Sequence, residues 1–212
     1  MEKFTITTEL REALTENLRR FQPVPIEDAN LRHAAVAIVV AGSQNDWTVP
    51  GILLTRRPVR LNQHSGQYAL PGGKIDPGET PQIAALRELR EELGMQLGES
   101  NIIGRLDDYP TRSKFRITPI VLWWGSQYEL SPSADEVDRV FHIPFHELDS
   151  DAIPVFEPGV EAGRPVLCSN FPTLGHRMYS PTASMIYQFR EVAIRGQSTR
   201  VAHYDQPRFA WK

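Results

Sequence analysis

The sequence predicts an α+β fold, or an α/β sandwich, built on a mixed β-sheet. Segments rich in Ile, Val, Phe and Trp lie on both sides of one amphipathic central segment, which indicates strands flanking a helix. Strands and helices do not alternate regularly, which argues against a purely parallel sheet. The chain has 212 residues and no internal repeat, so we expect one core with additions at both ends.

An amphipathic helix is predicted near the start, over residues 8–21, and Pro23 and Pro25 end it. Its apolar positions recur at spacings of three and four, with charged residues between them. We expect it to cover the core as part of a lead-in segment, residues 1–33. The apolar positions are Leu10, Leu14, Leu18 and Phe21.

Two strands are predicted next, over residues 34–41 and 51–56, separated by a Gly-Ser-Gln-Asn turn cluster. A polar loop of about a dozen residues follows, a length that is often functional in a compact domain. It leads into a short strand at residues 67–70, which the turn-forming residues 71–73 are expected to stop.

The central helix is predicted over residues 81–93, with Thr80 as its N-cap, Pro81 at the first position and Gly94 at the C-terminal stop. We expect its core face to consist of Ile83, Leu86, Leu89 and Leu93. Further strands are predicted at 101–108, 114–124 and 136–143, and a helix at 182–195.

These elements divide the chain into the lead-in, a main domain at residues 34–195 and a tail at 196–212. The tail has no clear periodicity, so we expect it to be partly disordered unless Phe209 and Trp211 dock it.

Composition and charge exclude several classes of function. The formal net charge is −3 and the Lys and Arg residues are scattered except near residues 56–60, so we expect no nucleic-acid partner. The longest apolar stretch, residues 34–41, is too short to span a bilayer, so we expect no membrane partner. The start lacks the pattern of a secretory signal, and the single cysteine, Cys168, cannot form an internal disulfide. These features favour a cytoplasmic protein.

One turn-and-helix segment carries the residue types of a metal site. Glu88, Glu91 and Glu92 stand at i, i+3 and i+4, so a helix places the three carboxylates on one face. Their mutual repulsion is reversed when a hard cation accepts their oxygens. Gly72 and Gly73 lie just before the helix, where missing Cβ atoms let the backbone approach a phosphate or a metal. The alternative is a solvated acidic helix face, and the adjacent glycines favour the metal site.

Residues 73–95 resemble the Nudix box. They read Gly73, five residues, Glu79, seven residues and then Arg-Glu-Leu-Arg-Glu-Glu-Leu-Gly-Met, which matches every defined position of that motif. The resemblance implies the family's α/β/α sandwich, with the catalytic helix packed on a mixed sheet. It also implies hydrolysis of a diphosphate linkage in a small nucleotide-type substrate, with Mg²⁺ as cofactor and Mn²⁺ as a substitute.

The resemblance implies roles for individual residues. Glu88, Glu91 and Glu92 correspond to the family's metal ligands and catalytic carboxylates. The carbonyl of Gly72 is expected as a further metal ligand, and Gly73 is expected beside the substrate phosphates.

Two further pairs of residues have expected roles. Glu79 and Arg87 correspond to the pair that ties the preceding loop to the helix. In many Nudix enzymes a carboxylate on a distant loop assists proton transfer, and here Asp135 and Glu136 precede a predicted strand. We expect Glu136 to be catalytic, and the alternative is that both are solvated loop charges.

The residues upstream of the box resemble the motif of the family's coenzyme A pyrophosphatases. The matching positions are residues 53–55, Gly66 and residues 71–73, and residues 181–183 are also similar to that branch. Three positions depart from the motif: Pro58 replaces a small residue, Asn62 replaces an arginine and Leu70 replaces a phenylalanine.

The missing arginine bears on phosphate binding. An arginine can hold a phosphate through two charge-assisted hydrogen bonds, whereas asparagine carries no charge. We therefore expect Arg56, Arg57 and Arg60 to bind the substrate, and the alternative is that they are solvated surface charges.

The sequence thus predicts a Mg²⁺-dependent hydrolase of coenzyme A or a derivative, giving 4′-phosphopantetheine and 3′,5′-ADP. ADP-ribose or another nucleoside diphosphate derivative is the alternative substrate. Pro110 favours it, because it lies beyond the box near the position where the family's ADP-ribose-specific members tend to carry a proline. A nucleotide-sensing Nudix module without turnover is the alternative of another class, although such modules often lose box glutamates. Because dimers are common in the family, a homodimer is expected.

Overall fold

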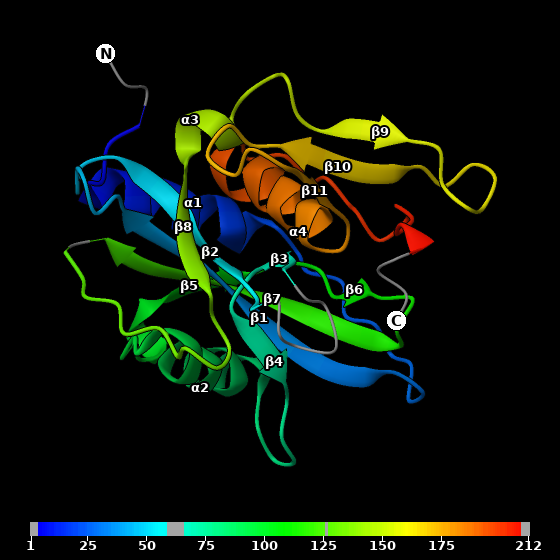
Figure 1. The fold of residues 1–212 in the computed structure, drawn as a ribbon, viewed down its shortest axis with the longest axis horizontal. Helices are drawn as coiled ribbons and strands as arrows, with labels where there is room; N and C mark the ends of the chain where they lie inside the picture. The colour runs from blue at the N-terminus through cyan, green and yellow to red at the C-terminus, as the bar shows by residue number, and fades with distance from the viewer. Residues whose placement is uncertain (1–3, 59–65, 126, 209–212) are drawn as a thin grey trace.

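The computed structural model describes residues 4–58, 66–125 and 127–208 and has the predicted α+β architecture. A central mixed sheet carries helix α2 on one side and helices α1 and α4 on the other (Figure 1). The strands of this sheet are β1 (Arg32–Gly42), β2 (Pro50–Arg56), β3 (Tyr68–Ala69), β4 (Gly72–Lys74), β5 (Ile102–Arg105), β6 (Tyr109–Pro110), β7 (Phe115–Gly125) and β8 (Arg139–Pro144).

Strand β1 organises the sheet. The strand order is β3-β2-β1-β7-β5, with β8 also beside β2, β4 beside β1 and β6 beside β7. Strands β1 and β7 run parallel, while the other strand pairs of this sheet are antiparallel. The mixed sheet predicted from the sequence is therefore confirmed.

A second, smaller antiparallel sheet of order β11-β10-β9 lies beside α4 and was not predicted. It consists of β9 (Val155–Glu157), β10 (Val166–Asn170) and β11 (Arg177–Tyr179). The helices are α1 (Thr8–Arg20), α2 (Pro81–Leu93), η1 (Glu99–Asn101), α3 (Phe145–Leu148), α4 (Thr182–Phe189) and the π-helix η2 (Arg190–Ile194). The helix predicted at 182–195 is therefore α4 continued by η2. No helix of the described residues has the length and apolarity needed to cross a membrane.

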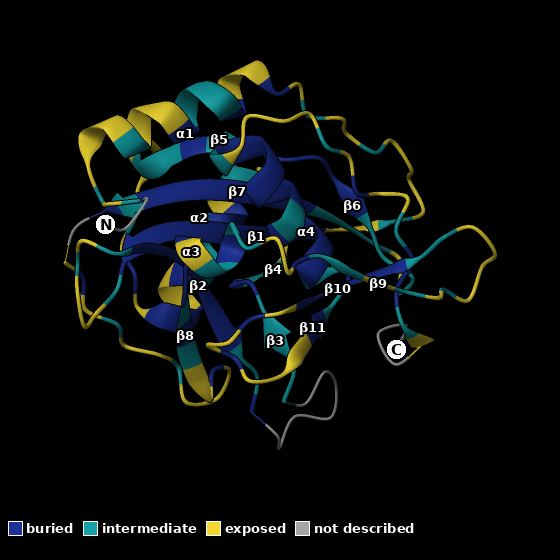
Figure 2. Ribbon diagram, turned by 90° about the horizontal axis from the view of Figure 1, so that it is seen from above, coloured by how far each residue is buried: buried dark blue, intermediate teal, exposed yellow. Residues whose placement is uncertain are grey.

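The two faces of the sheet build two cores. Successive side chains of β1 point to opposite faces, so Ala35 and Ala37 pack toward α2 while Val36 and Ile38 pack toward α1 and α4. Figure 2 shows β1 and β7 as buried strands, with the outer face of α1 exposed. Because both faces are covered, the strand is a nearly continuous apolar run, as its sequence predicted.

The core face of α2 differs from the prediction. Ile83 is 44% exposed and Leu86 is only half-buried. The helix turns two alanines toward the sheet instead, and their small side chains let it lie close to the alanines of β1. The apolar residues that α2 buries are Ala84, Ala85, Leu89 and Leu93.

Val201, Asp205 and Gln206 of the tail are buried, so the expected partial disorder is wrong for this part of the tail. Asp205 is buried and accepts hydrogen bonds from the backbone N–H of Val160 and of Gln206. The guanidinium of Arg112 also donates to it, at 2.9 Å. The buried Asp205 carboxylate therefore anchors this segment together with Gln206, whereas Phe209 and Trp211 lie outside the described residues.

Two adjacent buried carboxylates, Asp107 and Asp108, fasten the lead-in segment to the sheet. Asp107 accepts a hydrogen bond from the backbone N–H of Val24 at 2.7 Å, and Asp108 accepts one from Ile26 at 3.0 Å. The hydroxyl of Thr118 also donates to Asp108, at 2.7 Å. The strand predicted at 101–108 therefore ends at residue 105, because these carboxylates bind the lead-in instead of continuing the strand.

Replacing Asp108 by alanine is expected to lower the free energy of unfolding by roughly 2–4 kcal/mol, because the Ile26 N–H, the Thr118 hydroxyl and the Arg105 guanidinium lose an acceptor. Urea denaturation measures the change. The exposed Glu12→Ala is the matched control and is expected to stay within about 0.5 kcal/mol of the parent. A loss no larger than that of the control would contradict the anchoring role.

Candidate active site

The glycines before α2 belong to strand β4, which pairs with β1. The turn predicted at residues 71–73 is therefore wrong for Gly72 and Gly73. Gly72 has φ 154°, and a Cβ on it would overlap the backbone carbonyl of Ala35. A residue without a side chain is therefore needed at 72 to bring β4 against β1. This pairing holds the 72–74 backbone beside α2.

Helix α2 has the predicted bounds because both of its ends are capped locally. The hydroxyl of Thr80 accepts a hydrogen bond from the Ile83 N–H at 3.2 Å. Gly94 adopts the left-handed conformation, with φ 69°, and its N–H donates to the carbonyls of Leu89 and Arg90. These caps fix which residues share a helix face and so place the three glutamates.

Glu88 lies directly against Gly73. A Cβ on Gly73 would overlap the Glu88 carboxylate, so the absence of a side chain at 73 makes room for that carboxylate. Burial raises the pKa of Glu88, and the hydrogen bond from Arg87 opposes that rise. The missing side chain at 73 thus accommodates a carboxylate, and the approach of its backbone to a phosphate or a metal stays a prediction.

Glu92 is the most buried of the three box glutamates, with 5% of its surface exposed. Its Oε2 atom has no hydrogen-bond partner among the residues that the structure describes, while the carboxylate accepts the backbone N–H of Gly72. Burial and, next, the negative charge of Glu88 raise the pKa of Glu92 to about 8. A buried carboxylate oxygen without a partner, beside a second carboxylate, is a donor set that a hard cation would satisfy.

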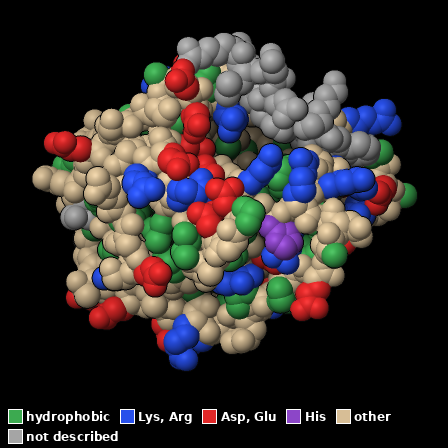
Figure 3. Space-filling view, turned by 90° about the horizontal axis from the view of Figure 1, so that it is seen from below, with side chains coloured by type: hydrophobic (Ala, Val, Ile, Leu, Met, Phe, Trp, Pro, Cys, Tyr) green, Lys and Arg blue, Asp and Glu red, His purple; other side chains and the backbone are tan. Residues whose placement is uncertain are grey.

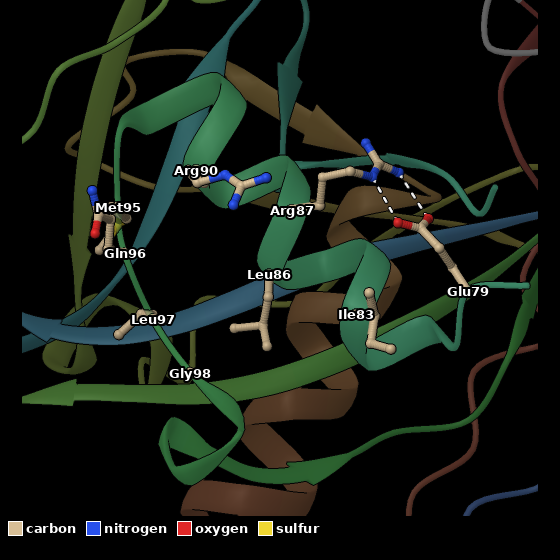
Figure 4. A pocket seen from close by; sticks show the side chains of 9 residues that line it. All are labelled: Glu79, Ile83, Leu86, Arg87, Arg90, Met95, Gln96, Leu97 and Gly98. Atoms are coloured by element: carbon tan, nitrogen blue, oxygen red, sulfur yellow. Dashed lines mark hydrogen bonds and ion pairs between the residues drawn. The ribbon is translucent and has the colours of Figure 1, made fainter.

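Arg87 ties the loop before α2 to the helix, as predicted. Its guanidinium donates to both oxygens of Glu79, at 2.9 and 3.1 Å, and to the carbonyl of Lys74 at 2.9 Å. Figure 4 shows the paired contacts with Glu79 at the rim of a cavity on the outer side of α2. The hydrogen bond from Arg87 also lowers the pKa of Glu79, which stays ionised in the pair.

The same guanidinium holds the exposed glutamate of the box. Arg87 Nη1 donates to Glu88 at 2.8 Å and to Glu91 at 2.9 Å, and Glu91 keeps 48% of its side chain exposed. Within the described ranges, no three His, Cys, Asp or Glu side chains converge on one point. The contacts with Arg87 account for this, because they draw the Glu88 and Glu91 carboxylates toward the guanidinium and leave Glu92 inside.

Glu136 is brought to the box by the segment that follows residue 130. The backbone N–H of Ser133 donates to the carbonyl of Glu92 at 2.9 Å, and the N–H of Glu136 donates to the carbonyl of Ser133 at 3.0 Å. The charge of Glu136 raises the pKa of both Glu88 and Glu92, so its carboxylate lies within their electrostatic reach. These contacts also explain why strand β8 starts at residue 139, later than predicted.

The structure separates the candidate phosphate-binding arginines. Arg56 donates to Asp138 at 2.8 Å, so its guanidinium is already paired. Arg57 lies closer to the glutamates, since its charge lowers the pKa of Glu92, and its Nε atom is buried and finds no hydrogen-bond partner within the described ranges. Two positions considered for phosphate binding lie outside the described residues: Arg60 and Asn62.

A cavity of about 270 Å³ adjoins the glycines and includes Arg57, Gly73, Phe115, Met185 and Gln206 in its lining. The last three were missed from the sequence, because they come from distant segments and belong to no motif. Figure 3 shows acidic side chains and Lys or Arg side chains gathered next to one another on the face seen from below. With Arg57 and Lys74 in the cavity lining and the box glutamates within electrostatic reach of Arg57, the site combines carboxylates for a cation with positive charge for an anion.

Comparison with known proteins identifies the family. Residues 31–167 match the model of the NUDIX domain. A Yersinia enterocolitica protein named uncharacterized Nudix hydrolase NudL is 37% identical over 139 residues, which cover 63% of this chain and 69% of that protein. Its namesake from Citrobacter koseri is 38% identical over 139 residues, covering 63% of this chain and 70% of that protein. Among solved structures, a MutT protein from Methanosarcina mazei Go1 is 19% identical with a TM-score of 0.43, over 60% of this chain and 83% of that chain. Because the family model spans more than half of the residues, the chain belongs to the Nudix hydrolase family.

Proposed function

We propose that the protein is a Mg²⁺-dependent hydrolase that cleaves the diphosphate linkage of coenzyme A or a derivative and releases 4′-phosphopantetheine and 3′,5′-ADP. One observation carries the proposal: a buried, unpartnered oxygen of Glu92 lies beside Glu88 and the backbone of Gly72. A buried polar oxygen left without a partner costs stability, so its retention at this point favours a bound cation.

The residues that would hold the metal are Glu88, Glu91, Glu92 and the carbonyl of Gly72. When bound there, Mg²⁺ would neutralise the diphosphate charge and make an attacking water more acidic.

The chain's own groups would carry the remaining steps. The oxygen of a water forms a bond to one phosphorus, and the bridging oxygen leaves on the other phosphate with its electron pair. The Glu136 carboxylate accepts the proton of that water and passes it to bulk water, since Glu136 is exposed. Arg57 and Lys74, which line the cavity beside Gly73, attract the phosphates by their charge.

We propose coenzyme A rather than ADP-ribose as the substrate because of the upstream motif and where its residues lie in the structure. Gly72 and Gly73 of that motif lie in β4 beside the glutamates, and they line the adjoining cavity together with Pro181 and Thr182. These four positions, which are similar to the coenzyme A branch, thus meet at one cavity although they are far apart in sequence. The named relatives carry no substrate in their names, so the substrate is tested directly.

The test is mass-spectrometric analysis of products after incubation with Mg²⁺ and, separately, coenzyme A, ADP-ribose, NADH and nucleoside triphosphates. Release of 4′-phosphopantetheine and 3′,5′-ADP is expected from coenzyme A. AMP from ADP-ribose alone would replace coenzyme A by the alternative substrate. No turnover of any compound, with nucleotide binding retained, would favour the non-catalytic module.

A further inference from the structure

The cavity of about 270 Å³ next to Gly73 has walls from two parts of the chain. One wall comes from the sheet within the matched residues 31–167. The other comes from outside them, from the start of α4 and from the tail, through Thr182, Met185 and Gln206. The part of the chain beyond the family model therefore shapes a cavity that reaches the proposed diphosphate site.

The lining is mostly apolar, with a few charged side chains among it. Val36, Ile117 and Met185 belong to, or pack against, the core on the α4 side of the sheet. The lining contains two charged residues, Arg57 and Lys74, and no acidic residue among those the structure describes there. Such a surface favours an uncharged, apolar group attached to an anionic one.

Arg57 lines the cavity and also acts on the box glutamates. Its Nε is buried and has no hydrogen-bond partner in the described part of the chain, although its charge acts on Glu92 across the site. A buried guanidinium N–H without an acceptor is costly, and a phosphate oxygen would supply that acceptor. The anionic group would therefore lie at the glutamate end and the apolar group farther inside.

Two aromatic side chains of the lining, Phe115 and Tyr68, already contact other side chains of the protein. The guanidinium of Arg32 lies 3.9 Å from the ring centroid of Phe115, over one face of that ring. Tyr68 meets Phe141 edge to face, with ring centroids 5.3 Å apart. These contacts reduce the ring surface available for stacking a purine, whereas Val36, Ile117 and Met185 offer aliphatic surface, so the lining favours an aliphatic group over a base. The volume is also small for a whole dinucleotide, since sites for complete ligands measure roughly 300–1,000 Å³.

The tail holds its side of the cavity in a fixed position. The Gln206 side chain donates to the carbonyl of Pro110 at 3.1 Å and accepts the N–H of Arg112 at 3.1 Å. Arg112 in turn pairs with the buried Asp205. A wall fixed in this way needs no ordering when a ligand binds, which preserves affinity.

We infer that this cavity binds an uncharged, aliphatic arm of the substrate, carried on the diphosphate, and that Ile117, Thr182 and Met185 select for that arm. The inference rests on the proposed function, because it takes the diphosphate to lie beside Gly73. In coenzyme A the group with this chemistry is the pantetheine arm, and the competing uncharged end is the adenosine.

The experiment is a titration of the full chain, labelled with ¹³C in its methionine methyl groups, with pantetheine and, separately, with adenosine. The chain has four methionines, and Met185 lines the cavity, whereas Met95 lies beneath α2 on the other side of the sheet and serves as the internal control. We expect pantetheine to shift the Met185 resonance saturably, at roughly millimolar concentration as for a small neutral fragment, and to leave Met95 unmoved.

Two variants locate the binding. Ile117→Phe fills the cavity and is expected to weaken pantetheine binding at least tenfold, while Ile117→Val keeps it within about twofold. Thr182→Tyr is a second filling variant from the opposite wall. A Met185 shift with adenosine but not with pantetheine would overturn the inference, and so would no shift with either. The readout needs neither metal nor turnover, so absent hydrolysis would count against the proposed function alone.

Discussion

Replacement of Glu92 by glutamine is expected to lower kcat by roughly two orders of magnitude or more while leaving the fold intact. The change keeps the shape of the side chain and removes the charge of a proposed metal ligand. Glu91→Gln is expected to lower kcat to a similar extent. Steady-state kinetics at saturating Mg²⁺ measures both, with Glu12→Gln as a control of equal charge change on the exposed face of α1. Unchanged turnover in Glu92→Gln would rule out the metal site proposed here.

The two variants are expected to differ in stability without metal. Glu92 is 5% exposed and its pKa is raised to about 8, so at a pH above that value, where the comparison is made, removing its charge relieves a buried, poorly solvated group. Glu91 is half exposed and hydrogen-bonded to Arg87, so its charge costs little in the folded state. Thermal unfolding in chelator should show Glu92→Gln at least as stable as the parent. A lower melting temperature for Glu92→Gln would mean that the charge stabilises the metal-free fold.

Alanine substitutions at the two adjacent glycines are expected to affect different properties, the catalytic rate at residue 73 and the stability of the fold at residue 72. Gly73→Ala should lower kcat by at least roughly tenfold with the fold retained, because its Cβ overlaps the flexible end of the Glu88 side chain and displaces that carboxylate. Gly72→Ala should destabilise the fold by roughly 3 kcal/mol or more, because its Cβ overlaps the backbone of Ala35 at φ 154°. Gly98→Ala is the matched control, since a Cβ there has no neighbour within 4 Å.

Kinetics and thermal unfolding of the three glycine variants together test the role of this backbone. If Gly73→Ala kept the full kcat, the position of Glu88 against residue 73 would be irrelevant to catalysis. If Gly72→Ala unfolded at the parent's temperature, the pairing of β4 with β1 would not depend on the missing side chain.

The sequence predicted those parts of the molecule that local signals specify. Thr80 and Gly94 cap α2 within a few residues of its ends, so both bounds were correct. The apolar run of β1 is long enough to indicate a strand buried on both faces. The grouping of Glu88 and Glu92 beside the glycines followed from the helix period, because neighbouring turns place these side chains on one face.

The remaining features depend on contacts between distant residues. Asp107 and Asp205 are single carboxylates whose burial follows from backbone N–H groups far along the chain, and nothing adjacent in sequence marks them. The strands of the small sheet have three to five residues, too few for a periodic pattern. The expected core position of Ile83 was wrong because apolar spacing alone could not show that alanines make the closest contact with β1.

The most direct test of the central claim is the rate of coenzyme A hydrolysis at different Mg²⁺ concentrations, with product release followed by mass spectrometry. The account predicts no turnover after the protein is treated with chelator, and a rate that rises to saturation when Mg²⁺ is restored. Turnover that continues at the same rate in chelator would contradict the claim that the glutamates of α2 act through a bound metal.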